Sequence, residues 1–450
     1  MRLVVVGGDA AGMSAASQAR RRLGADRLEI IAFERSNWVS YSACGEPYHV
    51  AGYVDPLERL VARTPDQFAE MDIAVKIRHE VTEIDLAGRT VAVADLDQGS
   101  RSQVGFDHLM LGMGATAIRP GIEGIDLPGV VELRTLDDAR LLRSVADGGP
   151  GAAVIIGGGY IGLEAAEAFR YRGWEVTVVT SGPSILERTI DPDMGRTVVD
   201  SMSGMGIRVV TDTRVRCING TDHVVSVGCE DGETHPADVV VLGLGSRPEA
   251  SLAEAAGIRL GETGAIAVDA RQRTSVDGVW AAGDCAEAQH RVTGRAVNHH
   301  LGTIANKTGR VAGINIGGGD AEFPGVLGTS ITKICDIEIA ATGLRLSDAI
   351  AFGFNAVEGT ARGTTTAGYW PAAAPITIRA VTERGSSRLL GAQIVGGPGS
   401  AKRIDVFATA IWTGMTAGDL AWTDLAYAPP FSGVWDLIHI AARKADDAAR

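Results

Sequence analysis

The sequence predicts an α/β protein in which two parallel-sheet units are followed by a C-terminal α+β unit. At the N-terminus, an apolar run at residues 2–6 leads through a glycine-rich turn into residues of helical composition at 12–22, and then into a second apolar run at 28–33. The same order recurs at residues 153–180, so a complete β-α-β unit is repeated. Beyond roughly residue 320, polar and apolar residues alternate as they do in antiparallel strands.

A chain of 450 residues is too long for a single hydrophobic core, and its length favours about three domains. We expect a first domain of the Rossmann-like type, a second of the same type, and a smaller third domain. Further strands are expected in the apolar runs 106–115, 237–245 and 278–286, and helices at 401–418 and 433–445. The expected limits are 1–112 with 247–320 for a split first domain, 113–246 for the second and 321–450 for the third.

The composition argues against several kinds of partner. The net charge of −13 disfavours nucleic acid, because a phosphate-binding surface needs clustered Lys and Arg. No apolar run reaches the ~18–20 residues of a membrane helix, and the N-terminus shows no signal-peptide pattern, so we expect no membrane partner and a cytoplasmic location. The five cysteines form no C-x-x-C pair and no ligand cluster, which predicts reduced thiols and no metal site.

The middle unit contains a glycine-rich loop, residues 157–162, with the pattern G-x-G-x-x-G between a predicted strand and a predicted helix. In this pattern the first glycine permits a tight turn, the second lets the backbone approach a pyrophosphate, and the third allows close strand–helix packing. The helix N-terminus adds N–H donors and a favourable dipole. We expect a dinucleotide to be bound here by Gly157, Gly159, Ile161, Gly162 and Gly245.

The first unit has a similar loop at residues 7–12, with Asp9 in place of the second glycine. A carboxylate there would repel a pyrophosphate if its side chain faced the ligand. Glu34 follows about 20 residues later, at the end of the second apolar run, where an acid bonds ribose hydroxyls. We expect a second dinucleotide to be bound by Gly7, Ala11, Gly12 and Glu34.

In the middle unit the corresponding acid is missing, because the second strand is followed by Thr180-Ser181. An acid at that place favours NAD and repels the 2′-phosphate of NADP. Its absence, with Arg188 nearby, favours NADPH over NADH. Arg188 could equally be a solvated loop charge, so both coenzymes stay open.

Segments 33–35 (Phe-Glu-Arg) and 40–48 (Ser-Tyr-Ser-Ala-Cys-Gly-Glu-Pro-Tyr) resemble the flavin-site signature of single-cysteine pyridine nucleotide-disulfide oxidoreductases. The branch most similar is coenzyme A-disulfide reductase, with NADH oxidases, NADH peroxidases and persulfide reductases as relatives. Supporting matches lie at 79–82, 282–286, 301–307 and 427–432. The resemblance covers the chain and implies an FAD-binding domain, an NAD(P)-binding domain and a dimerisation domain, hence a homodimer.

The resemblance also implies roles for single residues. Val81 would meet the adenine through its backbone, and Asp284 would bond the ribityl chain of FAD. The segment 302–306 would pass near the flavin ring. Further contacts to FAD are expected from Arg35, Gly302 and Ala305.

Cys44 is implied as the redox centre. Its thiolate would be the reactive form, and its place before Gly45 and Pro47 is compatible with a turn that enters a helix. No second cysteine lies four or five residues away, so Cys44 would cycle through a mixed disulfide, a persulfide or a sulfenic acid. From the partner subunit, Tyr427 and Tyr369 would reach this site.

The substrate branches differ at a few positions. Peroxidase and oxidase relatives carry a histidine where this chain has Ala10, which disfavours peroxide chemistry. Residues 17–21 (Ser-Gln-Ala-Arg-Arg) match the coenzyme A-disulfide branch, whose basic residues suit phosphates. Ala43 and Glu46 depart from that branch, and Glu46 would raise the pKa of the Cys44 thiol. Expected contacts to a thiol substrate are Ser14, Gln18, Arg21 and Ser40.

These patterns predict an FAD-dependent NAD(P)H oxidoreductase that reduces a small disulfide or persulfide through Cys44. The alternatives are an NAD(P)H oxidase or diaphorase that reduces oxygen or quinones at the flavin, and a non-catalytic redox sensor.

Overall fold

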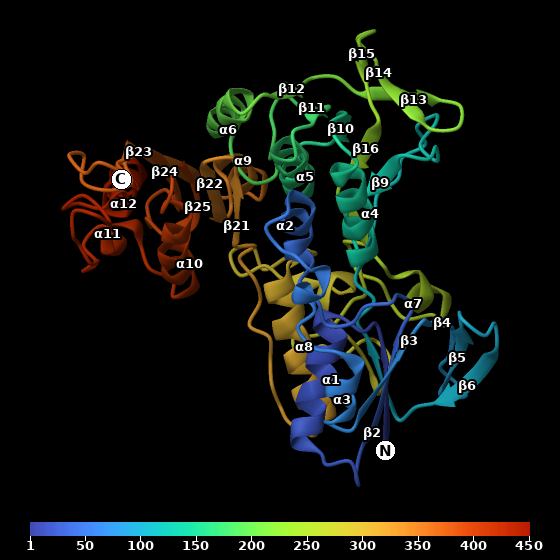
Figure 1. Ribbon diagram of the computed structural model, residues 1–450. Helices are drawn as coiled ribbons and strands as arrows, with labels where there is room; N and C mark the ends of the chain where they lie inside the picture. The colour runs from blue at the N-terminus through green and yellow to red at the C-terminus, as the bar shows by residue number, and fades with distance from the viewer.

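The computed structural model describes residues 1–450, and its first unit is built on a five-stranded parallel sheet (Figure 1). The strand order is β18 (Val279–Ala281), β7 (His108–Leu111), β1 (Arg2–Val6), β2 (Glu29–Glu34) and β3 (Ile73–Ile77). Helices α1 (Ala10–Arg22) and α8 (Gly302–Ile316) pack side by side against it. A small antiparallel sheet, β4 (His79–Asp85), β5 (Thr90–Asp95) and β6 (Arg101–Gly105), lies at the other side of the unit.

The middle unit repeats this plan. Its parallel sheet has the order β12 (Ile207–Val210), β11 (Glu175–Val179), β10 (Ala152–Ile156), β16 (Val239–Leu242) and β9 (Val130–Glu132). Its other elements are α4 (Leu136–Asp147), α5 (Tyr160–Tyr171), α6 (Pro192–Gly204), β13 (Val215–Gly220), β14 (Val224–Cys229) and β15 (Thr234–Pro236). Two segments connect the middle unit to the first unit, and they form a pair of antiparallel strands, β8 (Ala115–Ala117) and β17 (Ser246–Pro248).

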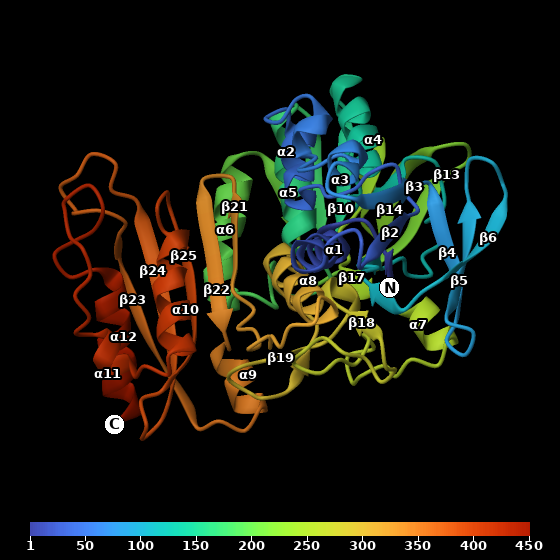
Figure 2. The ribbon, with the colours of Figure 1, turned by 90° about the horizontal axis from the view of Figure 1, so that it is seen from below.

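The C-terminal unit is an antiparallel sheet covered by helices, seen at the left of Figure 2. The sheet order is β21 (Ser330–Ile334), β22 (Ile337–Gly343), β25 (Leu389–Gly396), β24 (Pro375–Glu383) and β23 (Ala356–Thr364), with helices α9 (Leu346–Ala351), α10 (Ile404–Trp412), α11 (Ala417–Leu420) and α12 (Leu437–Ala449). The α/β fold with a C-terminal α+β unit is therefore confirmed, whereas the exact domain limits stay a prediction.

The predicted helix at 401–418 is wrong in extent. The chain leaves α10 after Trp412 and turns at Gly414, whose φ of +73° ends the helix before α11 begins. The last helix starts later than predicted, at Leu437, because the carboxylate of Asp436 accepts the Ile438 N–H at 2.9 Å and caps it.

Three short helices and one small strand pair complete the fold. Helix α2 (Glu46–Ala51) lies between α1 below and α5 above (Figure 1), and α3 (Pro65–Ala69) follows it. The others are α7 (Ser251–Ala255), β19 (Ala288–Gln289) and β20 (Ala296–Val297). None of the helices combines the length and the apolar character needed to cross a bilayer.

Close packing of α1 on α8 depends on two glycines of α8. A Cβ on Gly309 would come within 2.3 Å of the Ala11 carbonyl oxygen, and one on Gly313 within 2.3 Å of the Ala15 carbonyl oxygen. The two helices therefore touch backbone to backbone, which fixes the start of both helices at the carboxyl end of the first sheet.

Candidate active site between two glycine loops

The first glycine loop brings the end of β1 and the start of α1 together. A Cβ on Gly7, whose φ is +103°, would lie 2.2 Å from the Gly112 carbonyl oxygen. A Cβ on Gly12 would lie 2.0 Å from the Gly7 carbonyl oxygen. No side chain caps the first turn of α1, so its N–H groups are available to an anion, as a pyrophosphate site requires.

The structure explains Asp9, the residue that departs from the glycine pattern. Its Oδ1 accepts the Tyr41 N–H at 3.0 Å, and the N–H of Ser40 donates to the Gly8 carbonyl at 2.9 Å. Burial, and then the nearby Glu34 and Asp284, raises the pKa of Asp9 to about 6. Asp9 thus ties the segment before Cys44 to the glycine loop, with its carboxylate engaged by the protein.

Glu34 occupies the end of β2, as predicted. Its carboxylate accepts the N–H groups of Gly8 and Ser36, both at 2.8 Å, so it is fixed against the glycine loop. Arg35 is exposed and lies 4.0 Å from the carboxylate of Glu80. Val81 is buried on β4. These residues lie beside the first glycine loop, at one end of the candidate FAD site, and they fit the adenosine half of FAD.

The other end of the candidate FAD site is formed at the start of α8. Gly283 has a φ of +77°, and a Cβ there would lie 2.8 Å from the Cβ of Ala11 and 3.4 Å from that of Ala305. Next to it, the carboxylate of Asp284 accepts a hydrogen bond from Arg134 at 3.1 Å. Gly302 begins α8. The tight glycine cradle and the carboxylate at its end fit the pyrophosphate and ribityl parts of FAD.

Sequence reasoning missed a hydrogen-bonded histidine beside Asp284. The Nδ1 of His300 lies 2.5 Å from the Ser246 hydroxyl, and its Nε2 lies 2.6 Å from Oδ1 of Asn298. Burial lowers the pKa of His300, which favours the neutral ring. The pair His299-His300 directly before the start of α8 was the only available signal.

The second glycine loop has the same architecture as the first. A Cβ on Gly157, whose φ is +116°, would lie 2.3 Å from the Gly243 carbonyl oxygen, and one on Gly162 would lie 2.5 Å from that of Gly157. Gly159 precedes α5 without a side-chain cap, and Ile161 is exposed in its first turn. Gly245 follows β16 with a φ of +86°. This loop fits a second dinucleotide.

Cys44 lies between these two loops, in a single 3-10 turn (Ala43–Gly45) that runs directly into α2. It is the one exposed cysteine of the chain; Cys217 is half-buried and the other three are buried. Although Cys44 reaches the surface, partial burial of its thiol, and then the carboxylates Glu164 and Glu46, raises its pKa. Glu46 thus acts in the direction that the sequence predicted, whereas Glu164 of α5 was missed.

Glu46 is a buried acid with unusual surroundings. Its side chain is only 3% exposed, and Oε1 has no hydrogen-bond partner. Burial, and then Asp138, raises its pKa to about 8, while Arg134 acts in the opposite direction. Glu46 is therefore mostly protonated at neutral pH, so it does not repel an anionic substrate as a full charge would.

The expected substrate residues of α1 form a polar strip along α8. The Ser14 hydroxyl donates to Oδ1 of Asn306 at 2.8 Å, and Arg310 donates to Oε1 of Gln18 at 3.0 Å. Arg21 is exposed one turn further along. Ser40 lies apart, in the segment tied to Gly8. Arg310 was missed, although its place four residues after Asn306 puts both on one helix face.

The structure does not bring the expected tyrosines to Cys44 within one chain. Tyr369 and Tyr427 both belong to the C-terminal unit, where they are 76% and 46% exposed. Partial burial, and then hydrogen bonding with Tyr369, raises the pKa of Tyr427, so the two side chains are neighbours.

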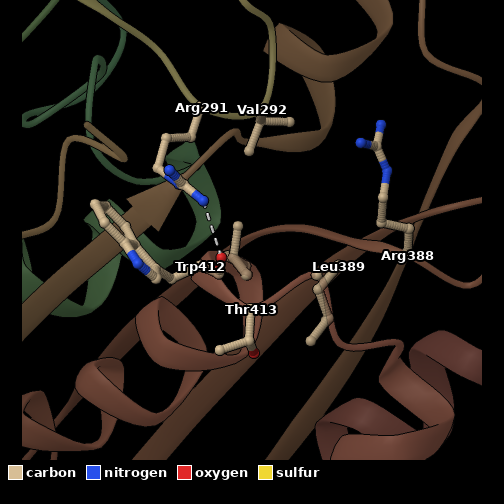
Figure 3. A pocket seen from close by; sticks show the side chains of 8 residues that line it. Arg291, Val292, Arg388, Leu389, Trp412 and Thr413 are labelled. Atoms are coloured by element: carbon tan, nitrogen blue, oxygen red, sulfur yellow. Dashed lines mark hydrogen bonds between the residues drawn. The ribbon is translucent and has the colours of Figure 1, made fainter. Parts of the chain in front are cut away.

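A hollow of about 310 Å³ lies elsewhere, between residues 291–292 and the C-terminal unit (Figure 3). Its two cations are already engaged. Arg291 stacks 4.0 Å from the ring centre of Trp412 and donates to the Trp412 carbonyl at 3.1 Å, and Arg388 stacks on Phe354. This hollow is not part of the candidate active site.

Comparison with known proteins agrees with this geometry. Residues 1–302 match the family model described as pyridine nucleotide-disulphide oxidoreductase, and residues 329–437 match the dimerisation domain of that family. The chain is 39% identical over 443 residues to the NAD(P)H sulfur oxidoreductase (CoA-dependent) of Pyrococcus abyssi, covering 98% of this chain and 97% of that protein. It is 29% identical over 447 residues to the coenzyme A disulfide reductase of Staphylococcus epidermidis, covering 99% of each.

A solved structure gives the same picture. The NAD-dependent persulfide reductase from A. fulgidus superposes with a TM-score of 0.96 at 40% identity, covering 100% of this chain and 83% of that one.

Proposed function

Because this chain belongs to the pyridine nucleotide-disulphide oxidoreductase family, we propose that it is an FAD-dependent enzyme that uses NAD(P)H to reduce a small disulfide or persulfide through Cys44. The observation that carries the proposal is the position of Cys44. It is the one exposed cysteine, and it lies on a turn between the two glycine loops with no second cysteine beside it.

The residues of the chain divide between two coenzymes and a substrate. FAD, when bound, would supply the two-electron transfer between NAD(P)H and sulfur. We assign its binding to Gly7, Ala11, Gly12, Glu34, Arg35, Val81, Asp284, Gly302 and Ala305. We assign NAD(P)H binding to Gly157, Gly159, Ile161, Gly162 and Gly245.

Cys44 would act as the nucleophile. Its thiolate attacks one sulfur of a disulfide R–S–S–R′, which forms Cys44–S–S–R and releases R′–S⁻. Two electrons from NAD(P)H then break the Cys44–S bond, which restores the Cys44 thiolate and releases R–S⁻. Since its surroundings raise the pKa of the Cys44 thiol, the attack should accelerate as the pH rises through that pKa.

The polar strip on α1 and α8 supports an anionic thiol substrate. Ser14 and Gln18 are held in place by Asn306 and Arg310, and Arg21 adds an exposed cation. Guanidinium groups in such a strip suit phosphates like those of coenzyme A. The names of the sulfur oxidoreductase and disulfide reductase relatives point to the same class of substrate.

We further propose a homodimer. The C-terminal unit exposes large apolar side chains on its loops, which is unusual for a free surface; they are Tyr369, Trp422, Phe431, Val434 and Trp435. A second copy would cover them and would bring Tyr369 and Tyr427 to the other copy's Cys44.

All five cysteines are free thiols, which supports a reducing compartment such as the cytoplasm.

The test is Cys44→Ser in the flavin-loaded enzyme. We expect NAD(P)H to reduce the bound flavin as before, while turnover with coenzyme A disulfide or a persulfide falls to background. Cys217→Ser, at the next most accessible cysteine, serves as the matched control and should keep full turnover. Unchanged disulfide turnover in Cys44→Ser, or fast oxygen uptake unaffected by the substitution, would instead favour direct reduction of acceptors at the flavin.

A further inference from the structure

The segment after β11 folds back onto the second glycine loop. The Leu186 N–H donates to the Gly158 carbonyl at 2.8 Å, and a Cβ on Gly158 would lie 3.1 Å from Cγ2 of Ile185. Leu186 has a φ of +53°, which reverses the chain at this point. The residue that follows, Glu187, therefore lies beside the loop expected to hold the NAD(P)H pyrophosphate.

The side chain of Glu187 points back to the end of β11. A Cβ on Gly182 would lie 2.2 Å from Oε1 and 2.3 Å from Oε2 of Glu187, so the carboxylate rests directly against the Gly182 backbone. The N–H of Ser184 donates to Oε1 at 3.3 Å. The side chain remains exposed to solvent and keeps acceptor capacity for a ligand. The structure thus places an acid near the end of β11, where the sequence has Thr180 instead of the expected acid.

One of the two arginines beside this acid is already paired. Arg345 donates to the main-chain oxygen of Glu187, but its guanidinium is already held by both carboxylate oxygens of Asp348, at 2.7 and 2.8 Å. On the other side of β11, the N–H of Asp212 donates to the Gly182 carbonyl at 3.0 Å, which adds a second carboxylate nearby. Arg188 has no ion-pair partner and is exposed. Two carboxylates, Glu187 and Asp212, therefore lie near the end of β11, and Glu187 is the one that rests on the Gly182 backbone.

We propose that Glu187 replaces the missing strand-end acid, accepts hydrogen bonds from the adenosine ribose hydroxyls of the nicotinamide coenzyme, and selects NADH over NADPH. This inference rests on the proposed function, since it assigns one residue of the same coenzyme site. A 2′-phosphate at this place would face the Glu187 carboxylate, which opposes its binding. NADH is then the preferred coenzyme, whereas the missing acid after β11 had favoured NADPH.

The experiment measures binding without turnover. The flavin-loaded enzyme is titrated calorimetrically with ADP-ribose and with 2′-phospho-ADP-ribose, which carry the discriminating part of each coenzyme. We expect ADP-ribose to bind at least roughly tenfold tighter, because a bonded hydroxyl is replaced by a repelled phosphate. In Glu187→Gln this preference should shrink severalfold, and in Glu187→Arg it should invert.

The matched control is Glu175→Gln, which removes an exposed carboxylate at the opposite end of β11 and should leave the preference unchanged. Equal binding of the two ligands by the unmodified enzyme, or an unchanged preference in Glu187→Gln, would overturn the inference while leaving the proposed function intact. Failure of both ligands to bind would count against the proposed function itself.

Discussion

Arg134 of the middle unit donates a hydrogen bond to Asp284 of the first unit, with 3.1 Å between the two atoms. Both side chains are mostly buried, at 27% and 16% exposure. Arg134 also donates to the Ala115 carbonyl in the link between the units, and it lies close enough to Glu46 to oppose the rise in the pKa of that acid. One guanidinium thus connects the first unit, the middle unit and the start of α2.

Removing this cation should destabilise the protein. In Arg134→Met, Asp284 loses its partner in a poorly solvated place, and we expect a loss of about 1–3 kcal/mol in the free energy of unfolding. Chemical denaturation of the flavin-loaded protein measures it. Arg208→Met, which breaks an exposed pair with Glu233, should cost less than about 0.5 kcal/mol. Equal losses in the two variants would show that the Arg134–Asp284 pair contributes no more to the free energy of unfolding than an exposed ion pair.

Asp9 should make stability fall as the pH rises. Its pKa is raised from 3.8 to about 6 in the folded chain, so the folded state holds a proton that the unfolded state has lost between those values. Stability is then highest below pH 4 for this group and declines up to about pH 6. Asp9→Asn keeps an acceptor for the Tyr41 N–H and removes the ionisation.

We expect Asp9→Asn to be more stable than the unmodified protein by up to about 2 kcal/mol at pH 7.5, with a smaller gain at pH 5. Denaturation curves at the two pH values measure this difference. Asp9→Ala, which also lacks the acceptor, should gain less at both. A gain for Asp9→Asn that is the same at both pH values would contradict the assigned ionisation.

Glu46 should limit the reactivity of Cys44 mainly at high pH. Its pKa is about 8, so below that value it is neutral and above it the new carboxylate raises the pKa of the neighbouring thiol further. In Glu46→Gln we expect the rate of Cys44 alkylation by iodoacetamide to rise about two- to fivefold above pH 8.5 and to change little at pH 6.5. Glu164→Gln removes the other carboxylate that raises the pKa of the Cys44 thiol, so it should also raise the rate at pH 8.5. A uniform increase in Glu46→Gln would show that its effect is not electrostatic.

The sequence predicted those parts of the site that depend on local backbone geometry. Glycines such as Gly7 and Gly157 are required because a Cβ would strike a carbonyl of the neighbouring strand, and that requirement leaves a fixed pattern in the chain. Cys44 was identifiable because the turn and helix that follow it are local as well.

Contacts between distant segments could not be predicted in the same way. Arg310 meets Gln18 only because α1 and α8 pack together, and Glu164 reaches Cys44 only because α5 packs on α2. The carboxylate of Glu187 returns to Gly182 through a reversed backbone at Leu186, for which the sequence carries no recognised pattern. The sequence showed that Asp9 departs from the glycine pattern, but the hydrogen bond from the Tyr41 N–H to its carboxylate depends on tertiary structure.

The proposed contribution of the partner subunit can be tested by complementation. Cys44→Ser removes the nucleophile, and the double substitution Tyr369→Phe/Tyr427→Phe removes both hydroxyls of the exposed pair. Each homodimer should lose most of its disulfide turnover. In a heterodimer of the two variants, one site would combine an intact Cys44 with the intact tyrosines of the other chain.

If the tyrosines act across the interface, co-expressed heterodimers purified through two different tags should regain close to half of the unmodified turnover per dimer, because one of two sites is complete. If the tyrosines acted within their own chain, neither site of the heterodimer would be complete, and turnover per dimer would be only the mean of the two homodimer values. The exposed positions of Tyr369 and Tyr427 on the C-terminal unit, and the place of Cys44 between the first and middle units, favour the first outcome. A tyrosine double variant with normal turnover would remove these residues from the reaction altogether.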